Sequence, residues 1–477
     1  MTDYSFDAVG EQMKKMLDNA IQTYLFEHEW IGTPTDGFEG SGWDTRLPRV
    51  SAAHAGTIQL RFNMMSQTRT ARIPPGARYV KDEQEGYLLY QVYELDPYVD
   101  IYEPIIDRVN KAFLGWRTLP DPADFAAVKG VLADVVDELT PDEQQDGSYS
   151  FVDVKVQSAI ELMNKWVSPQ GQQASSDLLF AFDSAYGVGR ITGVMTNQAQ
   201  VAAGLGLAVA GEEQVWTKAR ADLMAIAVDG AEALRWDGGG GGTIDLGVVK
   251  AFVDLVKVFT PASLGILMDG LSAGIGFLQE VIPEQTTEKK ESTISGGSAM
   301  EVLANIEKAV SDLESAIFNE EQEIAKKMRK LGEIIGSRNA EDFHIHPGAG
   351  VDETFAKAAE IRINVDMVRT IGTRDVPTIA GAFLDAADLA SGQTGSGIWS
   401  REQNIGYGSI GPHTPWNARM SDLDAMATGS ARELVEAGRR LAIAAGWVED
   451  SDISSHSAIS DHKDELDRGK YEWSASS

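Results

Sequence analysis

Two histidines that alternate along a short segment are the residues best suited to chemistry. In His344-Ile-His346 the two imidazoles would share one face of an extended chain and could both reach a metal ion, with Glu341 or Asp342 nearby. A metal site needs a third and usually a fourth ligand, and the Pro-Gly pair directly after the histidines is typical of a surface loop. The loop is the stronger interpretation, so we expect no metal ion and no cofactor.

No motif supplies a catalytic nucleophile together with its base. Cysteine is absent, which excludes disulfides, thiolate zinc sites, iron-sulfur clusters and cysteine nucleophiles. The sequence has no Gly-x-Ser-x-Gly elbow, phosphate-binding P-loop or His-Glu-x-x-His pattern. Gly187-Val-Gly189 and the glycine run 238–242 do not follow predicted strands, so neither is a dinucleotide fingerprint. We therefore expect a protein that is not an enzyme.

A tryptophan and a glycine mark a predicted helix corner. Trp236-Asp-Gly238 lies where one helix should end and the next begin, so the indole could wedge into a hairpin cleft while the glycine allows a tight turn. Trp30-Ile-Gly32 has the same form, and composition alone predicts about one such match. We name Trp236 and Gly238 the helix-corner motif.

The clearest apolar stripe lies in the second half of the chain. Its residues recur every three or four positions, with Glu320 at one step, a one-residue slip at Met328, and Glu and Lys on the flanks. This spacing predicts a coiled-coil-like helix whose stripe must face another helix. We call this stripe the interaction seam: Leu303, Ile306, Val310, Leu313, Ile317, Ile324, Met328, Leu331 and Ile335.

The pattern of apolar residues along the chain predicts the elements that would position these residues. It indicates a mainly α protein: an elongated helical bundle with helical hairpins, a coiled-coil segment and a smaller mixed N-terminal region. Its regions are a mixed N-terminal domain (1–150), a long-helix bundle with an apolar helix pair (151–282), a linker (283–298), a coiled-coil helix with a C-terminal helical hairpin (299–452) and an acidic, partly disordered tail (453–477).

Local signals place several boundaries more closely in the first half of the chain. A helix should begin near Pro120-Asp-Pro122 and run to about Leu139, because proline suits a first helical turn. Alternation within 52–102 suits either short strands or a buried helix. A helical register spans 175–235, and its internal glycines predict a bend or break at one of Gly204, Gly206, Gly211 and Gly230.

Other boundaries follow in the second half. A shorter helix is expected at 244–259, followed by an apolar pair at 261–280. The arms of the C-terminal hairpin are expected at 366–389 and 416–448, joined by a Gly/Ser/Thr loop.

Charge limits the classes of partner. The 41 basic and 72 acidic residues give a formal charge of −31, which opposes binding to nucleic acid and to anionic lipid. The apolar stretch 258–281 is interrupted by Pro261 and Asp269 and does not suit a membrane span. Residues 1–17 lack the apolar run of a cleavable signal peptide. The protein is expected to be cytoplasmic, or secreted without such a signal.

Two stretches resemble helical-bundle proteins associated with actinobacterial type VII (ESX) secretion. The first runs from Phe182-Asp-Ser-Ala-Tyr186 into the long arm with Gln214-Val-Trp216 and 219–223, and the second pairs 363–369 with the helix from Leu434 to Asp450. The resemblance implies export without a cleaved signal, helical pairing with a partner, and a Trp-x-Gly motif at a helix corner. The C-terminal hairpin loop differs from this Trp-x-Gly motif, because in Trp399-Ser-Arg the third residue is arginine and not glycine.

Three functions fit these observations. The first is a non-enzymatic helical assembly or secretion-associated protein that acts through protein–protein contacts, by self-association or with a helical partner. The second is a membrane-active, pore-forming helical protein that uses 261–281. The third is a virion or phage structural protein.

Overall fold

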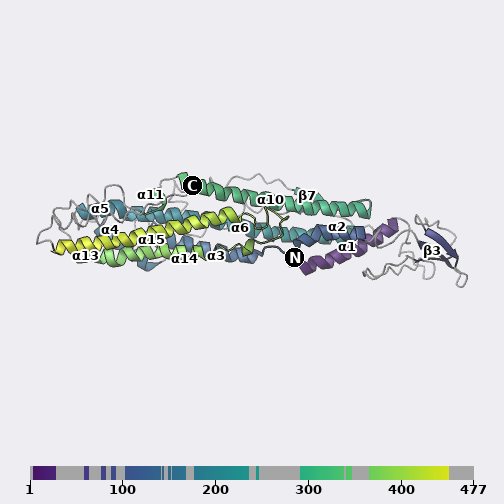
Figure 1. The fold of residues 1–477 in the computed structure, drawn as a ribbon, viewed down its shortest axis with the longest axis horizontal. Helices are drawn as coiled ribbons and strands as arrows, with labels where there is room; N and C mark the ends of the chain where they lie inside the picture. The colour runs from purple at the N-terminus through teal and green to yellow at the C-terminus, as the bar shows by residue number, and fades with distance from the viewer. Residues whose placement is uncertain are drawn as a thin grey trace.

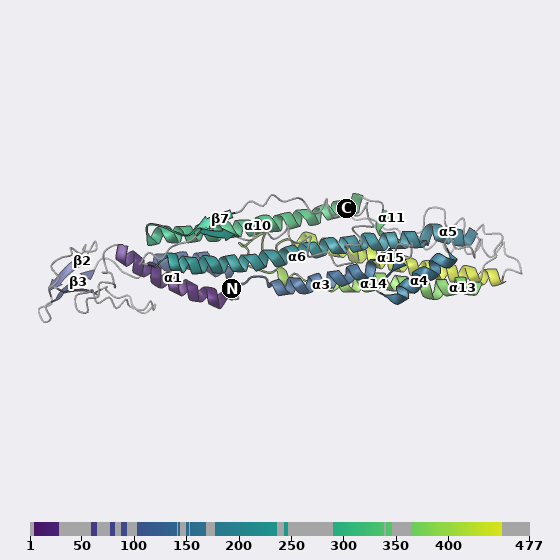
Figure 2. The ribbon, with the colours of Figure 1, turned by 180° about the vertical axis from the view of Figure 1, so that it is seen from behind.

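The computed structural model describes residues 4–27, 59–63, 77–81, 87–92, 103–140, 142–143, 149–151, 153–167, 177–235, 243–246, 290–337, 340–345 and 365–450. Long helices dominate these residues and lie side by side along one axis (Figures 1 and 2). The mainly α, elongated bundle expected from the sequence is therefore confirmed. Within the described ranges, none of the helices combines the length and apolar character that a membrane span requires.

The bundle is built from long α-helices, with shorter helices and helical turns between them. In chain order they are α1 (Phe6–Glu27), α2 (Glu103–Phe113), η2 (Leu114–Arg117), α3 (Pro122–Leu139), α4 (Val154–Trp166), α5 (Asp177–Tyr186), α6 (Val188–Ala233), α10 (Ala299–Ser337), α11 (Ala340–Phe343), α13 (Val365–Thr370), the π-helical turn η4 (Ile371–Asp375), α14 (Val376–Ser391), η5 (Gly397–Trp399) and α15 (His413–Asp450).

Strands form small sheets at the margins. β1 (Gln59–Asn63), β3 (Tyr87–Val92) and β2 (Ala77–Lys81) pair antiparallel in that order, so the alternation in this region marks strands and not a buried helix. This sheet lies beyond the end of α1 (Figures 1 and 2). β4 (Asp142–Glu143) pairs with β5 (Tyr149–Ser150), and β6 (Thr243–Leu246) pairs with β7 (Lys290–Thr293).

Helix α6 is the centre of the bundle. It has 46 residues, which corresponds to about 70 Å of helix. Almost every side chain from Gln198 to Glu212 is buried, because α1, α3, α10 and α15 all pack against it. A helix that is buried on all sides needs small or apolar residues around its whole circumference, and the Ala/Gly/Leu/Val stretch 201–211 supplies them. Helices from both halves of the chain thus share one core.

The sequence predicts a bend or break at one of the internal glycines of this arm, and the prediction of a break there is wrong. α6 runs unbroken through Gly204, Gly206, Gly211 and Gly230, and the break lies earlier, at Gly187. A Cβ atom at Gly187 would collide with the Asp183 carbonyl oxygen. Inside α6 the glycines instead permit close packing: a Cβ at Gly230 would lie 2.9 Å from Ile306 Cδ1 of α10. Close packing of α10 outweighs the weak helix propensity of glycine.

Helix α10 buries the interaction seam within the same chain. All seam residues are buried except Ile335, which is half-buried beside the buried Ile334. The seam side of α10 meets α6, with α1, α2 and α15 at its borders. The seam therefore faces other helices, as its spacing requires, but its apolar side chains are not open to a second protein.

The C-terminal hairpin is also present. α14 and α15 pack along one another, and α3 covers another side of α14. The π-helical turn η4 ends two residues before Pro377, whose ring and missing N–H disfavour a regular α-turn in the preceding residues. At this level Gly372 and Gly438 bring the backbones of η4 and α15 into contact, since a Cβ at Gly372 would lie 2.5 Å from the Gly438 carbonyl oxygen.

Other boundary predictions have mixed outcomes. Asp121 caps α3 through a 3.0 Å bond from Ala123 N–H, and Pro122 begins the helix, as predicted. The helix expected from Ile244 is wrong at its start, because Ile244 lies in β6, and the expected linker contains β7 with the buried Ile294 after it. The apolar pair at 261–280 and the tail 453–477 lie outside the described residues.

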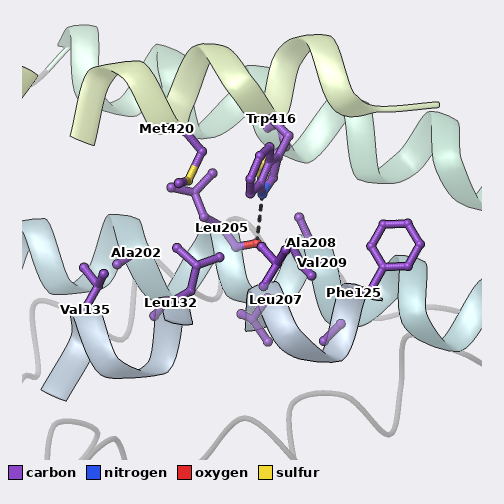
Figure 3. Packing of buried hydrophobic residues seen from close by; sticks show 14 of the residues in the cluster. Phe125, Leu132, Val135, Ala202, Leu205, Leu207, Ala208, Val209, Trp416 and Met420 are labelled. Carbon is purple, nitrogen blue, oxygen red and sulfur yellow. Dashed lines mark hydrogen bonds between the residues drawn. The ribbon is translucent and has the colours of Figure 1, made fainter. Parts of the chain in front are cut away.

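Aromatic residues close the middle of the core between α3, α6 and α15. Trp416 Nε1 donates a 3.2 Å hydrogen bond to the Leu205 carbonyl oxygen on α6, with Phe125 of α3 nearby (Figure 3). Trp399 packs edge-on against Phe125 at 5.0 Å between ring centroids and lies 5.3 Å from Trp416. These contacts fix the start of α15 and the base of the loop 392–412.

The close crossing at Gly438 gives a stability prediction with a control on the same helix. Gly438→Ala would place a methyl group against the backbone oxygen of Gly372, and we expect the free energy of unfolding to fall by about 1–3 kcal/mol. Gly446→Ala meets no atom within 4 Å and should raise it by about 0.5–1 kcal/mol. Urea denaturation measures both changes. Equal effects of the two substitutions would show that the backbones are not in contact.

Candidate functional site

Of the sequence-predicted site residues, the structure places His344 and the interaction seam. His344 is half-buried after α11, with its ring near Gly429 of α15, whereas His346 lies outside the described residues. Trp236 and Gly238 of the helix-corner motif also lie outside them. In the part of the chain that the structure describes, no three His, Asp or Glu side chains are arranged to hold a metal ion. The interaction seam lies in the core.

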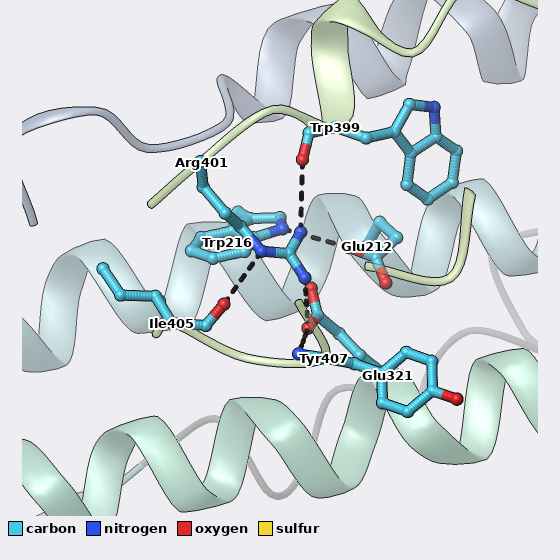
Figure 4. Close-up of polar contacts among 7 residues, drawn as sticks. All are labelled: Glu212, Trp216, Glu321, Trp399, Arg401, Ile405 and Tyr407. Carbon is cyan, nitrogen blue, oxygen red and sulfur yellow. Dashed lines mark hydrogen bonds and ion pairs between the residues drawn. The ribbon is translucent and has the colours of Figure 1, made fainter. Parts of the chain in front are cut away.

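The most unusual chemistry lies where the loop 392–412 crosses α6 and α10. Glu212 of α6, Glu321 of α10 and Arg401 of the loop converge there (Figure 4). The side chains of Arg401 and Glu321 have no exposed surface, and Glu212 is also completely buried. We call these three residues the ion cluster.

Arg401 is bound on several sides by groups of the protein. Its Nη2 forms a charge-assisted hydrogen bond with Glu321 Oε2. Its Nε donates to the Ile405 carbonyl oxygen at 3.0 Å, and its Nη1 donates to the Trp399 carbonyl oxygen at 3.3 Å. The guanidinium thus closes the loop onto itself and attaches it to α10.

Trp216 connects the arginine to the second acid. The guanidinium carbon of Arg401 lies 4.9 Å from the centre of the Trp216 ring, which is cation–π geometry. The indole Nε1 of Trp216 donates a 3.0 Å hydrogen bond to Glu212 Oε2, one helical turn earlier in α6. Residues 212 and 216 of α6 therefore form the floor of the ion cluster.

Two glycines allow the loop to close around the charges. Gly406 and Gly411 have positive φ angles of 68° and 50°. A Cβ at Gly406 would collide with Glu321 Oε2, and one at Gly411 would lie 2.5 Å from Arg401 Nη2. The next residue after Gly406 uses its backbone, since Tyr407 N–H donates to Glu321 Oε2 at 2.6 Å. Both positions need glycine for conformation and for space.

Burial shifts both carboxyl groups toward the neutral form. It raises the pKa of Glu212 to about 7, although the positive charge of Arg401 acts in the opposite direction. The pKa of Glu321 is raised well above its usual value, first by burial and then by the charge of Glu212. The cluster contains two acids and one base, so the second acid has no cation to balance it.

A second pair of buried charged residues on α10, Glu320 and Lys327, lies beside the ion cluster in sequence. Glu320 occupies the polar step of the interaction seam, and burial raises its pKa to about 7, with the nearby Lys327 acting against this shift. Burial lowers the pKa of Lys327 to about 8. These groups are on the same helix as Glu321, but neither is among the groups that act on the ion cluster.

Sequence reasoning missed the ion cluster. Glu321 follows the seam position of Glu320, Glu212 ends the apolar stretch of α6, and Arg401 stands in a Gly-rich loop. Each looks like an ordinary surface charge in its local context. The available signal was the acidic pair 212–213 directly after about ten apolar or small residues of an otherwise regular helix.

The geometry determines what the ion cluster can do. The donors of Arg401 are directed at carbonyl and carboxylate oxygens of the protein, and its face is covered by an indole ring. Such an arrangement holds a loop in one conformation and can hold or release a proton.

Comparison of the chain with family models, with curated proteins and with solved structures gave no match.

Removing the arginine should leave buried acids without their cation. We expect Arg401→Met to lower the free energy of unfolding at pH 7 by about 3–5 kcal/mol, because breaking a buried pair strands the remaining charge. Arg439→Met, at an exposed ion pair on α15, should change it by less than about 0.5 kcal/mol. Chemical denaturation compares the two. A loss for Arg401→Met as small as that for Arg439→Met would contradict a structural role for the cluster.

Two glycines of the same loop separate conformation from contact. Gly408 has φ of 79° and an open surrounding, so Gly408→Ala should lower stability by about 1–2 kcal/mol through its backbone conformation alone. Gly406→Ala carries the same conformational penalty and also places a methyl group on Glu321, so its loss should be larger. Thermal denaturation of both variants measures the difference, which disappears if Glu321 is not beneath the loop.

Proposed function

We propose that the protein is a non-enzymatic helical assembly protein that works through protein–protein contacts, primarily with further copies of itself. The resemblance to type VII secretion proteins extends the proposal to a secreted substrate of that class, exported without a cleaved signal. The observation that carries the proposal is the pair of outward faces on the hairpin α14–α15. These faces expose large apolar side chains beside charges of opposite sign.

The outward stripe of α15 combines arginine with aliphatic residues. Positions 432, 435, 439 and 443 are all exposed and recur at helical spacing. Val435 and Ile443 remain 46% and 36% exposed, which is high for aliphatic side chains on a well-packed helix. Arg439 binds Glu436 in the same helix at 2.7 Å, which orients its guanidinium along the surface. We call these residues the α15 stripe: Arg432, Val435, Arg439 and Ile443.

The outward face of α14 has the opposite charge. Leu384 and Leu389 are 42% and 36% exposed, and Asp385 and Asp388 are exposed between them. We call these four residues the α14 face. An α15 stripe laid on the α14 face of another copy would pair aliphatic with aliphatic side chains and arginine with aspartate. Since the two surfaces differ, the contact is heterologous and can continue from copy to copy.

Self-association should therefore depend on the α15 stripe. In light-scattering measurements at micromolar concentration, we expect the wild type to associate and the double variant Val435→Glu/Ile443→Glu to weaken association about tenfold or more. The double variant Leu114→Glu/Val154→Glu adds the same charge at side chains that are 52% and 70% exposed elsewhere, and it should associate like the wild type.

A mixing experiment tests the heterologous geometry. Asp385→Arg/Asp388→Arg should also prevent self-association, because it places arginine opposite arginine. Mixed with the Val435→Glu/Ile443→Glu variant, it should form pairs that grow no further, since each variant keeps one intact surface. A wild type that remains monomeric throughout the micromolar range would count decisively against the proposed function.

A further inference from the structure

The ion cluster contains one more acid than its single cation can balance. Glu321 Oε2 accepts hydrogen bonds from Arg401 and from the Tyr407 backbone, and Glu212 Oε2 accepts from Trp216. The other oxygen of each group, Oε1, is buried and accepts no bond from the N–H or O–H donors of the described chain. The two groups nevertheless act on each other: the charge of Glu212 raises the pKa of Glu321, and Arg401 acts on both.

Two neighbouring buried carboxyl groups can form a hydrogen bond with each other only if one of them keeps a proton. Two carboxylates are both acceptors and repel each other, whereas a carboxylic acid can donate to a neighbouring carboxylate. One proton between Glu212 and Glu321 leaves a single negative charge opposite the Arg401 guanidinium. The buried cluster is then neutral overall, which is the condition for burying it without a large desolvation penalty.

We propose that Glu212 and Glu321 share a single proton while the bundle is closed, and that losing this proton releases the loop segment 401–411 from α6 and α10. The inference concerns the attachment of this loop segment to α6 and α10, and it does not depend on the proposed self-association. The ligand of the site is the proton itself.

Few buried side chains hold the loop segment 401–411 in place. Residues 402–404 and 408–409 are exposed. The buried residues of the segment are Arg401, Ile405 and Gly411, of which the first two attach it through side chains. Beyond them, the ring of Tyr407 packs at a tilt against Phe318, with 5.6 Å between ring centroids, and its hydroxyl accepts a 2.9 Å hydrogen bond from Arg329. The helices α6 and α10, by contrast, are packed along much of their length. Extra negative charge in the cluster is therefore relieved most easily by moving the segment.

The groups that act on the shared proton come from each element around it. Glu212 faces Glu321 of α10, Arg401 of the loop and the indole N–H of Trp216 on α6. Glu321 faces Glu212 of α6, Arg401 and the backbone N–H of Tyr407. Arg401 favours loss of the proton, whereas burial and the repulsion between the two acids favour keeping it.

The direction of the pH effect follows from these influences. The pKa of Glu212 is raised to about 7, and that of Glu321 is raised well above 4.5. Above pH 4.5 the folded cluster thus holds more protons than the same residues hold in the unfolded chain. Its stabilising contribution is complete below pH 4.5 and is lost as the pH rises through about 7 and beyond. The segment should therefore be closed in mildly acidic solution and open in alkaline solution.

Hydrogen exchange measured by mass spectrometry on the full chain tests this device. After correction for intrinsic rates, protection of the peptide that covers 401–411 should fall about tenfold or more between pH 6 and pH 9 in the wild type. Glu321→Gln imitates the protonated acid, because its amide can donate to Glu212 while its oxygen accepts from Arg401 and Tyr407. In that variant the protection should change less than about twofold over the same range.

The neighbouring buried acid supplies the control. Glu320→Gln removes another group of raised pKa from the same helix, but it should leave the pH response of the 401–411 peptide intact. If Glu321→Gln does not fold, Glu212→Gln should abolish the response instead, since either amide leaves one carboxylate for Arg401. A wild-type segment equally protected at pH 6 and pH 9, or a response lost equally in Glu320→Gln, would overturn the proposal.

Discussion

A guanidinium group placed where water cannot reach it is the constraint on which the middle of the bundle depends. A buried cation must find protein acceptors for its hydrogens and an opposite charge nearby. Arg401 finds them in the carbonyl oxygens of its own loop, in Glu321 and in the face of Trp216. The path of the loop, the positive φ angles of its glycines and the placement of α10 beside α6 all meet this requirement.

The central helix explains why so much of the molecule is shared between distant parts of the sequence. α6 is buried along most of its length, so it must be covered by helices from both sides of it in the chain. Small residues at positions such as Gly204 and Gly230 let the covering helices approach closely. With the seam of α10 used for this covering, its buried side chains are not open to another protein, and the proposed self-association uses the outward faces of α14 and α15 instead.

Predictions from local pattern succeeded where local forces decide. Pro122 and its capping Asp121 start α3 where the sequence indicates, because a proline and an N-cap act within one helical turn. The expectation of a break within α6 was wrong, because glycine propensity is a small term compared with burial against neighbouring helices. Ile244 joins a strand for a similar reason: its partner, Ser292 of β7, lies far along the chain.

The sequence by itself determined a long-helix, acidic bundle with a seam on α10 and a C-terminal hairpin, because apolar spacing is a property of one helix at a time. Only the tertiary structure decided that the seam is covered by the same chain and that Glu212, Glu321 and Arg401 share one dry site. Arg401 and Glu321 are separated by 80 residues in sequence. Their charges interact strongly only after folding removes the water between them. A local sequence pattern cannot predict this interaction.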